Sequence, residues 1–188
     1  MQAKTKNRLT IIFTVLLFTG PVVVAYLLSS GAIDYHPEDT KNNGRFISPL
    51  VKVADHAQGD WVDGLMGHWT LIRRVPGSCE NNCEQLQDEL QRYRLSLGHR
   101  SEKLNLMLLT DQPLALTEDP FPQVQKVSIA AFTDFQQVLG QLSAESLGEG
   151  HGLYVVAPEG FMMMMFTAQN TSSEIIKDLS LLVKRKGD

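Results

Sequence analysis

The feature that most constrains this chain is an uncharged, apolar run over residues 9–30. About twenty apolar residues, each rising ~1.5 Å along a helix, cross the ~30 Å hydrocarbon core of a bilayer. Lys4, Lys6 and Arg8 precede the run, and acidic residues follow it. Because basic residues favour the cytoplasmic end of a span, residues 1–8 are expected in the cytoplasm. The sequence thus predicts a single-pass protein of the inner (cytoplasmic) membrane, anchored in lipid, with its C-terminal domain in the periplasm.

A cleaved signal peptide is the alternative to this anchor, because small residues occupy positions 29–32. The apolar core of a signal peptide is usually only ~7–15 residues long, which favours an uncleaved anchor. Residues 31–60 are expected to form a polar spacer and an edge segment. Residues 46–61 either add an edge strand to the sheet or only pack on the domain. Residues 61–188 are expected to form one folded domain.

Hydrophobic periodicity in this last part predicts an α/β domain. Apolar residues recur at three- and four-residue steps over residues 83–97, which predicts an amphipathic helix ended by Gly98. Thr171 and Glu174 form a capping box at the start of a last helix. Strands are predicted at residues 69–72, 104–109, 127–132, 153–156 and 161–166, and a further short helix at 133–142. This order predicts a mixed central sheet flanked by helices and closed by a hairpin.

Composition and charge exclude several function classes. The net charge of -4 comes without a basic stripe, so nucleic acid is not an expected partner. Two cysteines are too few for a four-cysteine zinc site, and no grouping typical of a hydrolase is present. The four methionines at residues 162–165 predict a strand packed on both faces, because alternate strand residues point in opposite directions.

The two cysteines, Cys79 and Cys83, lie between the first predicted strand and the amphipathic helix. Residues four apart in a regular helix have Cβ atoms ~5–6 Å apart, whereas a disulfide needs ~3.5–4.5 Å. The pair can therefore close only with Cys79 in the turn before the helix and Cys83 in its first turn. A helix N-terminus stabilises a thiolate, which promotes nucleophilic attack and metal ligation. Arg73 and Arg74 would add to this stabilisation of the thiolate, and Glu80 and Glu84 would oppose it.

A purely structural disulfide is the simplest interpretation of this pair. The loop that it would close is very short, and chain-entropy reasoning makes such a crosslink the least stabilising kind. A redox or ligand-binding role explains the placement better, and the crosslink stays open as the alternative.

The strand at residues 69–72, the Cys79 and Cys83 pair opening a helix, and the hairpin at 153–166 with its turn at 157–160 together resemble the Sco (SenC-type) family. The anchor and spacer fit the same pattern. The resemblance implies a thioredoxin-like fold and a function in cytochrome c oxidase biogenesis. Such a protein serves the oxidase copper site as a copper carrier or as a thiol–disulfide reductant. The implied partners are an oxidase subunit or other assembly factors.

The resemblance also assigns the site residues. Cys79 and Cys83 correspond to the family's two thiols, which act in catalysis or ligate the metal, and His151 corresponds to its distant histidine. Two thiolates and one imidazole suit copper by their softness. In the reductant role Cys79 would attack the target disulfide and Cys83 would resolve the mixed disulfide.

Two rival functions remain open from the sequence. The first is a non-catalytic, membrane-tethered assembly or interaction protein with a structural Cys79–Cys83 disulfide. It is supported by Glu80 and Glu84, which stand where the family usually has prolines. The second is a thiol–disulfide oxidoreductase of broad substrate range, against which the C-x-x-x-C spacing in place of C-x-x-C argues.

Overall fold

The computed structural model describes residues 2–29, 42–77, 83–113, 121–146 and 152–184. The chain divides into two compact units, Met1–Lys41 and Asn42–Asp188. Of the predicted site residues, Cys83 lies within the described residues, whereas Cys79 and His151 lie outside them.

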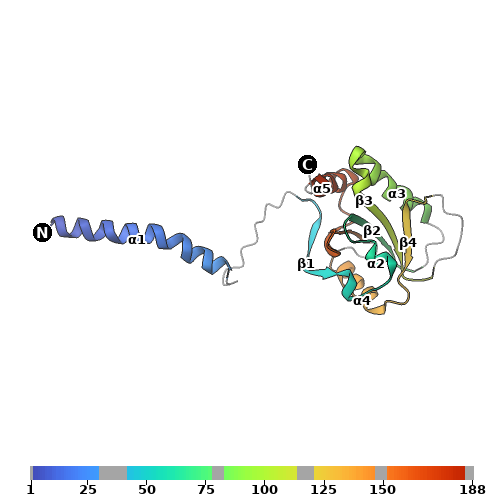
Figure 1. Cartoon of the computed structure of the whole chain (residues 1–188), viewed down its shortest axis with the longest axis horizontal. Coiled ribbons are helices and arrows are strands. Elements are labelled where there is room, and N and C mark those ends of the chain that lie inside the picture. Colours follow the sequence, from blue (N-terminus) through green and yellow to red (C-terminus); the bar gives the residue numbers. More distant parts are fainter. Residues whose placement is uncertain (1, 30–41, 78–82, 114–120, 147–151, 185–188) are drawn as a thin grey trace. The chain divides into compact units, whose positions relative to one another are not determined.

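The first unit contains helix α1 (Gln2–Ser29), which has Pro21 inside it (Figure 1). The sequence predicts a membrane span at residues 9–30. Among the residues that the structure describes, however, no helix is both long enough and apolar enough to cross a bilayer.

The second unit is built on a six-stranded sheet with the order β1-β6-β5-β2-β3-β4. The strands are β1 (Arg45–Lys52), β2 (Trp69–Val75), β3 (Leu104–Thr110), β4 (Val124–Ser128), β5 (Leu153–Val156) and β6 (Phe161–Phe166). The helices are α2 (Asp60–Asp63), α3 (Cys83–Ser96), α4 (Thr133–Ser146) and α5 (Ser172–Lys184), with 3-10 turns η1 (Val53–Asp55) and η2 (Gly98–Lys103). Strands β2, β3 and β4 are parallel, and the remaining neighbours are antiparallel. The predicted mixed sheet flanked by helices is therefore confirmed.

Helices cover both faces of this sheet (Figure 1). On one face, α3 and α5 pack over the strand side chains that point toward them, which include Leu71, Val155 and Met164. On the other face α2 and α4 pack over the alternate side chains, which include Ile72 and Met165. The methionine-rich strand β6 thus contributes to both halves of the core, as the sequence predicts.

Strand β4 occupies a different position from the predicted one. The sequence predicts it at residues 127–132, but it pairs in parallel with β3 from Leu106↔Val124 to Thr110↔Ser128 and ends where β3 ends. After it, the Phe132 N–H donates to the Ile129 carbonyl at 2.9 Å, which turns the chain toward α4. Pairing with a neighbour, rather than the apolar run itself, sets the bounds of this strand.

Helix α4 is longer than predicted. The sequence places its end at Gly140 or just beyond, yet the helix continues to Ser146. Leu139 is fully buried and Ser143 is 4% exposed, so the helix on both sides of the glycine packs on the domain. This packing outweighs the ~1 kcal/mol by which a glycine weakens a helix.

The capping box of α5 is confirmed. The Thr171 N–H donates to Oε2 of Glu174 at 2.8 Å, and the Glu174 N–H donates to Oγ1 of Thr171 at 3.4 Å. The Glu174 carboxylate accepts hydrogen bonds from both the N–H and the hydroxyl of Thr171, and these two bonds lower the pKa of Glu174.

A buried carboxylate joins α5 to the segment that leads into β1. Oδ2 of Asp178 accepts hydrogen bonds from the backbone N–H groups of Asn43 and Gly44, both at 2.7 Å, and Oδ1 accepts one from Nδ2 of Asn43 at 2.8 Å. Asp178 is only 2% exposed. A Cβ at Gly44 would come within 2.6 Å of the Phe166 ring, so the backbone passes directly over β6. Strand β1 pairs with β6 at one end of the sheet, so it is an edge strand, the first of the two options that the sequence leaves open.

Replacing Asp178 by alanine is expected to lower the free energy of unfolding by about 3 kcal/mol. The change removes one acceptor group shared by three donors, and buried donors without a partner cost ~1–3 kcal/mol each. Urea denaturation measures the loss, with Lys177→Ala, an exposed neighbour on the same helix, as the control. Equal midpoints for the two variants would contradict the prediction.

Candidate functional site

Cys83 is the first residue of α3, the helix that follows β2. Its side chain is half-buried and packs against the core cluster beneath α3 and α5. Cys83 is disulfide-bonded in this structure. A disulfide at a helix N-terminus after a central strand is a placement suited to thiol exchange, because the helix terminus stabilises the thiolate that forms on opening.

Gly152, the first described residue after His151 in the sequence, lies at the same edge of the sheet. Strands β2, β3 and β4 are parallel, so their carboxyl ends lie together, and β5 is antiparallel to β2 and begins at that edge. The backbone N–H of Arg74 donates to the carbonyl of Gly152 at 2.9 Å. The residue that follows His151 in the sequence is therefore hydrogen-bonded to the strand that precedes the cysteine segment.

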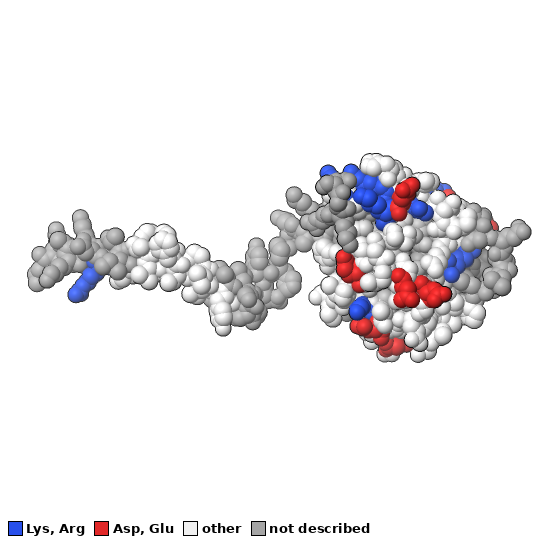
Figure 2. All heavy atoms as spheres, viewed as in Figure 1, with Lys and Arg blue, Asp and Glu red and all other residues white. Residues whose placement is uncertain are grey.

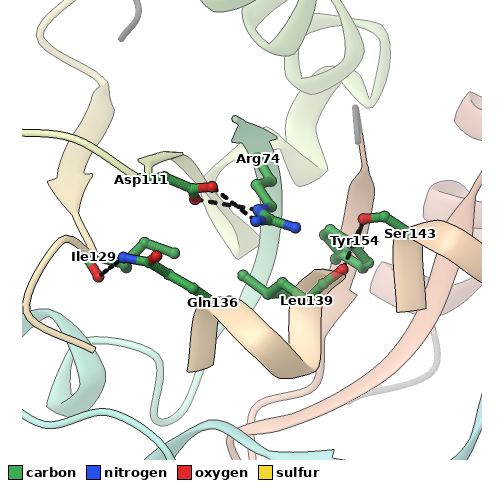
Figure 3. A network of polar contacts seen from close by, with 7 residues as sticks. All are labelled: Arg74, Asp111, Ile129, Gln136, Leu139, Ser143 and Tyr154. Atoms are coloured by element: carbon green, nitrogen blue, oxygen red, sulfur yellow. Dashed lines mark hydrogen bonds and ion pairs between the residues drawn. The ribbon is translucent and has the colours of Figure 1, made fainter. Parts of the chain in front are cut away.

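An ion pair between the buried Arg74 and the partly exposed Asp111 lies at this edge. The Arg74 guanidinium reaches Asp111, with Nη2 2.8 Å from Oδ2 and Nε 3.2 Å from Oδ1 (Figure 3). Arg74 is 7% exposed. The two hydrogen bonds form the bidentate geometry in which arginine binds a carboxylate most strongly.

From the sequence, Arg73 and Arg74 are expected to favour a cysteine thiolate, but both have carboxylate partners. Arg74 pairs with Asp111, and Nη2 of Arg73 lies 3.7 Å from Oε2 of Glu89. A cation that is already paired with a carboxylate exerts a weaker field on a third group. On the face of the second unit shown in Figure 2, Lys and Arg side chains also lie close to acidic ones.

Tyr154 completes the polar network beside the ion pair. Its hydroxyl lies 2.9 Å from Oγ of Ser143, which donates to the Leu139 carbonyl at 2.7 Å (Figure 3). Burial raises the pKa of Tyr154, with Asp111 adding to the shift and Ser143 and Arg74 opposing it, so the phenol is neutral at pH 7.

The ring of Tyr154 also explains the glycine that opens β5. A Cβ at Gly152 would come within 2.3 Å of three atoms of Tyr154, its hydroxyl oxygen among them. Only glycine allows the backbone to approach the ring this closely. The sequence pattern did not predict this network, and its one signal is Asp111, an acidic residue two positions after the apolar run at 104–109.

The predicted copper ligands are not tested by this geometry. Among the described residues, no group of three or more His, Cys, Asp or Glu side chains is placed to hold a metal ion. Two of the three predicted ligands, Cys79 and His151, lie outside those residues. The set of Cys79, Cys83 and His151 therefore stays a prediction.

Several solved structures are similar to this chain. No curated protein matches the sequence. The solved structures that are similar include yeast Sco1, with a TM-score of 0.49 and 16% identity, covering 68% of this chain and 86% of that chain. Another is Bradyrhizobium japonicum ScoI with copper bound, with a TM-score of 0.44 and 16% identity, covering 75% and 98%. A third is a thiol:disulfide interchange protein from Bacteroides sp., with a TM-score of 0.39 and 10% identity, covering 67% and 80%.

A family model assigns most of the sheet domain. The model described as "Transmembrane-like, thioredoxin-like, C-terminal domain" matches residues 69–185, which run from β2 to the end of α5. The matched part contains the parallel strands, the helix that Cys83 opens and the closing hairpin. The chain therefore belongs to the transmembrane-like, thioredoxin-like family that this model describes.

Proposed function

We propose that the protein assists cytochrome c oxidase biogenesis as a thiol–disulfide reductant for the oxidase copper site, acting through Cys79 and Cys83. The observation that carries the proposal is the disulfide-bonded Cys83 at the first residue of α3 in a thioredoxin-like domain. The link to the oxidase rests on the resemblance of the sequence to the Sco family. An oxidase subunit with two oxidised cysteines at its copper site is the proposed partner.

The reaction is a thiol–disulfide exchange in two steps. The Cys79 thiolate attacks one sulfur of the target disulfide, which forms a mixed disulfide and releases the first target thiolate. The Cys83 thiolate then attacks the Cys79 sulfur, which releases the second target thiolate and leaves a Cys79–Cys83 disulfide. Two electrons pass from the pair to the target. The half-buried position of Cys83 suits the resolving role, because the attacking thiolate must be the more accessible one.

Copper carriage is the second candidate, with copper as the cargo. It is favoured by the hydrogen bond from the Arg74 N–H to the Gly152 carbonyl, which joins the residue after His151 to the strand before the cysteines. Cys79, Cys83 and His151 would supply two thiolates and one imidazole, a donor set suited to copper.

Equilibration with glutathione separates both candidates from the scaffold alternative. A structural disulfide has a reduction potential below about −300 mV, whereas pairs that work in exchange lie at about −270 to −120 mV. We expect the reduction potential of the wild-type pair to fall in the second range. The potential is obtained from the fraction of alkylated cysteine, which mass spectrometry measures at each glutathione ratio. A potential below about −300 mV would favour the scaffold protein with a structural disulfide.

We also propose that the protein resides in the inner membrane, with its N-terminus in the cytoplasm and its domain in the periplasm. The support is the uncharged run at residues 9–30 behind Lys4, Lys6 and Arg8. After fractionation, the full-length chain should stay in the membrane pellet through an alkaline wash. Protease added to spheroplasts should digest the domain. Recovery of a soluble periplasmic form without the first thirty residues would contradict the proposal.

A further inference from the structure

Gln87 is a wholly buried amide without a hydrogen-bond partner. The residue is 0% exposed, and neither its Nε2 nor its Oε1 has a hydrogen-bond partner in the part of the chain that the structure describes. Leaving a buried polar group unpaired destabilises the fold, and most buried side-chain polar atoms in folded proteins are bonded. An amide with both ends unpaired thus calls for a group that it bonds in another state of the protein.

The position of Gln87 on α3 indicates which group this is. Gln87 follows Cys83 by four residues, so the two lie on the same face of the helix, one turn apart. Helical side chains lean toward the helix N-terminus and cover the preceding turn, so the amide of Gln87 extends over the turn that Cys83 opens. The same stretch of α3 buries Leu90, and Cys83 itself packs on the cluster that contains Leu90. The shared face is therefore sheltered from water.

We propose that Gln87 is a positioning residue whose Nε2–H donates to the sulfur of Cys83 when the disulfide is open; the inference rests on the proposed exchange function. In the oxidised protein the Cys83 sulfur is bonded to another sulfur and is a weak acceptor, and the amide is unpaired, as observed. Reduction adds two electrons and two protons and leaves one thiol on each cysteine. With glutathione as reductant, the electrons come from two glutathione thiols, which leave as glutathione disulfide. The released sulfur accepts strongly, particularly as a thiolate.

This hydrogen bond has a definite effect on the redox balance. Because it forms only in the reduced state, it favours the dithiol over the disulfide and makes the pair easier to reduce. Glutamine supplies the donor without adding a charge, which suits a face packed against the apolar core. Gln87 thereby sets the potential at which the pair exchanges electrons.

Gln87→Met tests the inference, because methionine keeps the length of the side chain and removes both polar ends. We expect the equilibrium with glutathione to shift about tenfold toward the disulfide. Gln91→Met, one turn further along α3 and also with an unpaired Oε1, is the matched control and should shift it less than about twofold. In wild-type protein labelled with ¹⁵N-glutamine, the side-chain amide resonance of Gln87 should move on reduction by a phosphine more than that of Gln91.

Two results would overturn the inference. One is an equal redox equilibrium in the Gln87→Met and Gln91→Met proteins. The other is a lower thermal midpoint of oxidised Gln87→Met than of oxidised wild type, which would mean that the amide is paired in the oxidised domain. If the wild-type pair does not exchange with glutathione at all, the proposed function fails. In that case the role of Gln87 is still decided by whether its side-chain amide resonance moves when a phosphine reduces the protein.

Discussion

Replacing both Cys79 and Cys83 by serine is expected to reduce oxidase activity to the level of a strain that lacks the protein. Serine forms no disulfide, and its hydroxyl is neither a thiolate nucleophile nor a soft copper ligand. Reductant and copper-carrier activity are therefore lost together. The measurement is oxidase activity and copper content in membranes of the null strain carrying each variant, with protein levels checked by immunoblot.

The single-residue variants separate the two candidate mechanisms. His151→Ala should leave oxidase activity near the wild-type level if the pair acts only as a reductant, and should lower it strongly if copper is carried. Ser173→Ala, an exposed position on α5, is the control for handling and expression. Full assembly in the double-serine strain would rule out both mechanisms and leave the scaffold function.

The second large effect concerns stability: Asp111→Ala is expected to lower the free energy of unfolding by about 3–5 kcal/mol. Removing one partner of a buried ion pair leaves the other charge uncompensated, and Arg74 is only 7% exposed. Urea denaturation of the oxidised domain measures the loss. The exposed pair of Asp88 and Arg92 on α3 supplies the control, since Asp88→Ala should cost less than about 0.5 kcal/mol.

A double variant distinguishes the lost charge balance from a lost contact. Arg74→Met combined with Asp111→Leu removes both charges and fills a similar volume, so it should recover most of the stability lost in Asp111→Ala. If Asp111→Ala costs no more than Asp88→Ala, the ion pair does not contribute to stability as its burial implies.

The sequence predicted the parts of this protein that depend on near neighbours. The start of α3 at Cys83 follows from the apolar period of its own residues, and the start of α5 follows from Thr171 and Glu174. The two-sided burial of β6 follows from its continuous apolar stretch. By contrast, the bounds of β4 are set by pairing with β3, and local apolar content alone misplaced them by several residues.

The candidate site divides in the same way. The sequence by itself determined that Cys83 opens a helix after a strand, because turn residues and periodicity act over a few positions. Only the tertiary structure decided that Arg74 pairs with Asp111, 37 residues away, and that Asp178 holds Gly44 across 134 residues. It also placed Gly152 against the Tyr154 ring and left the Gln87 amide unpaired one turn from Cys83. These features depend on which elements become neighbours when the sheet assembles, and no local pattern of residues records that choice.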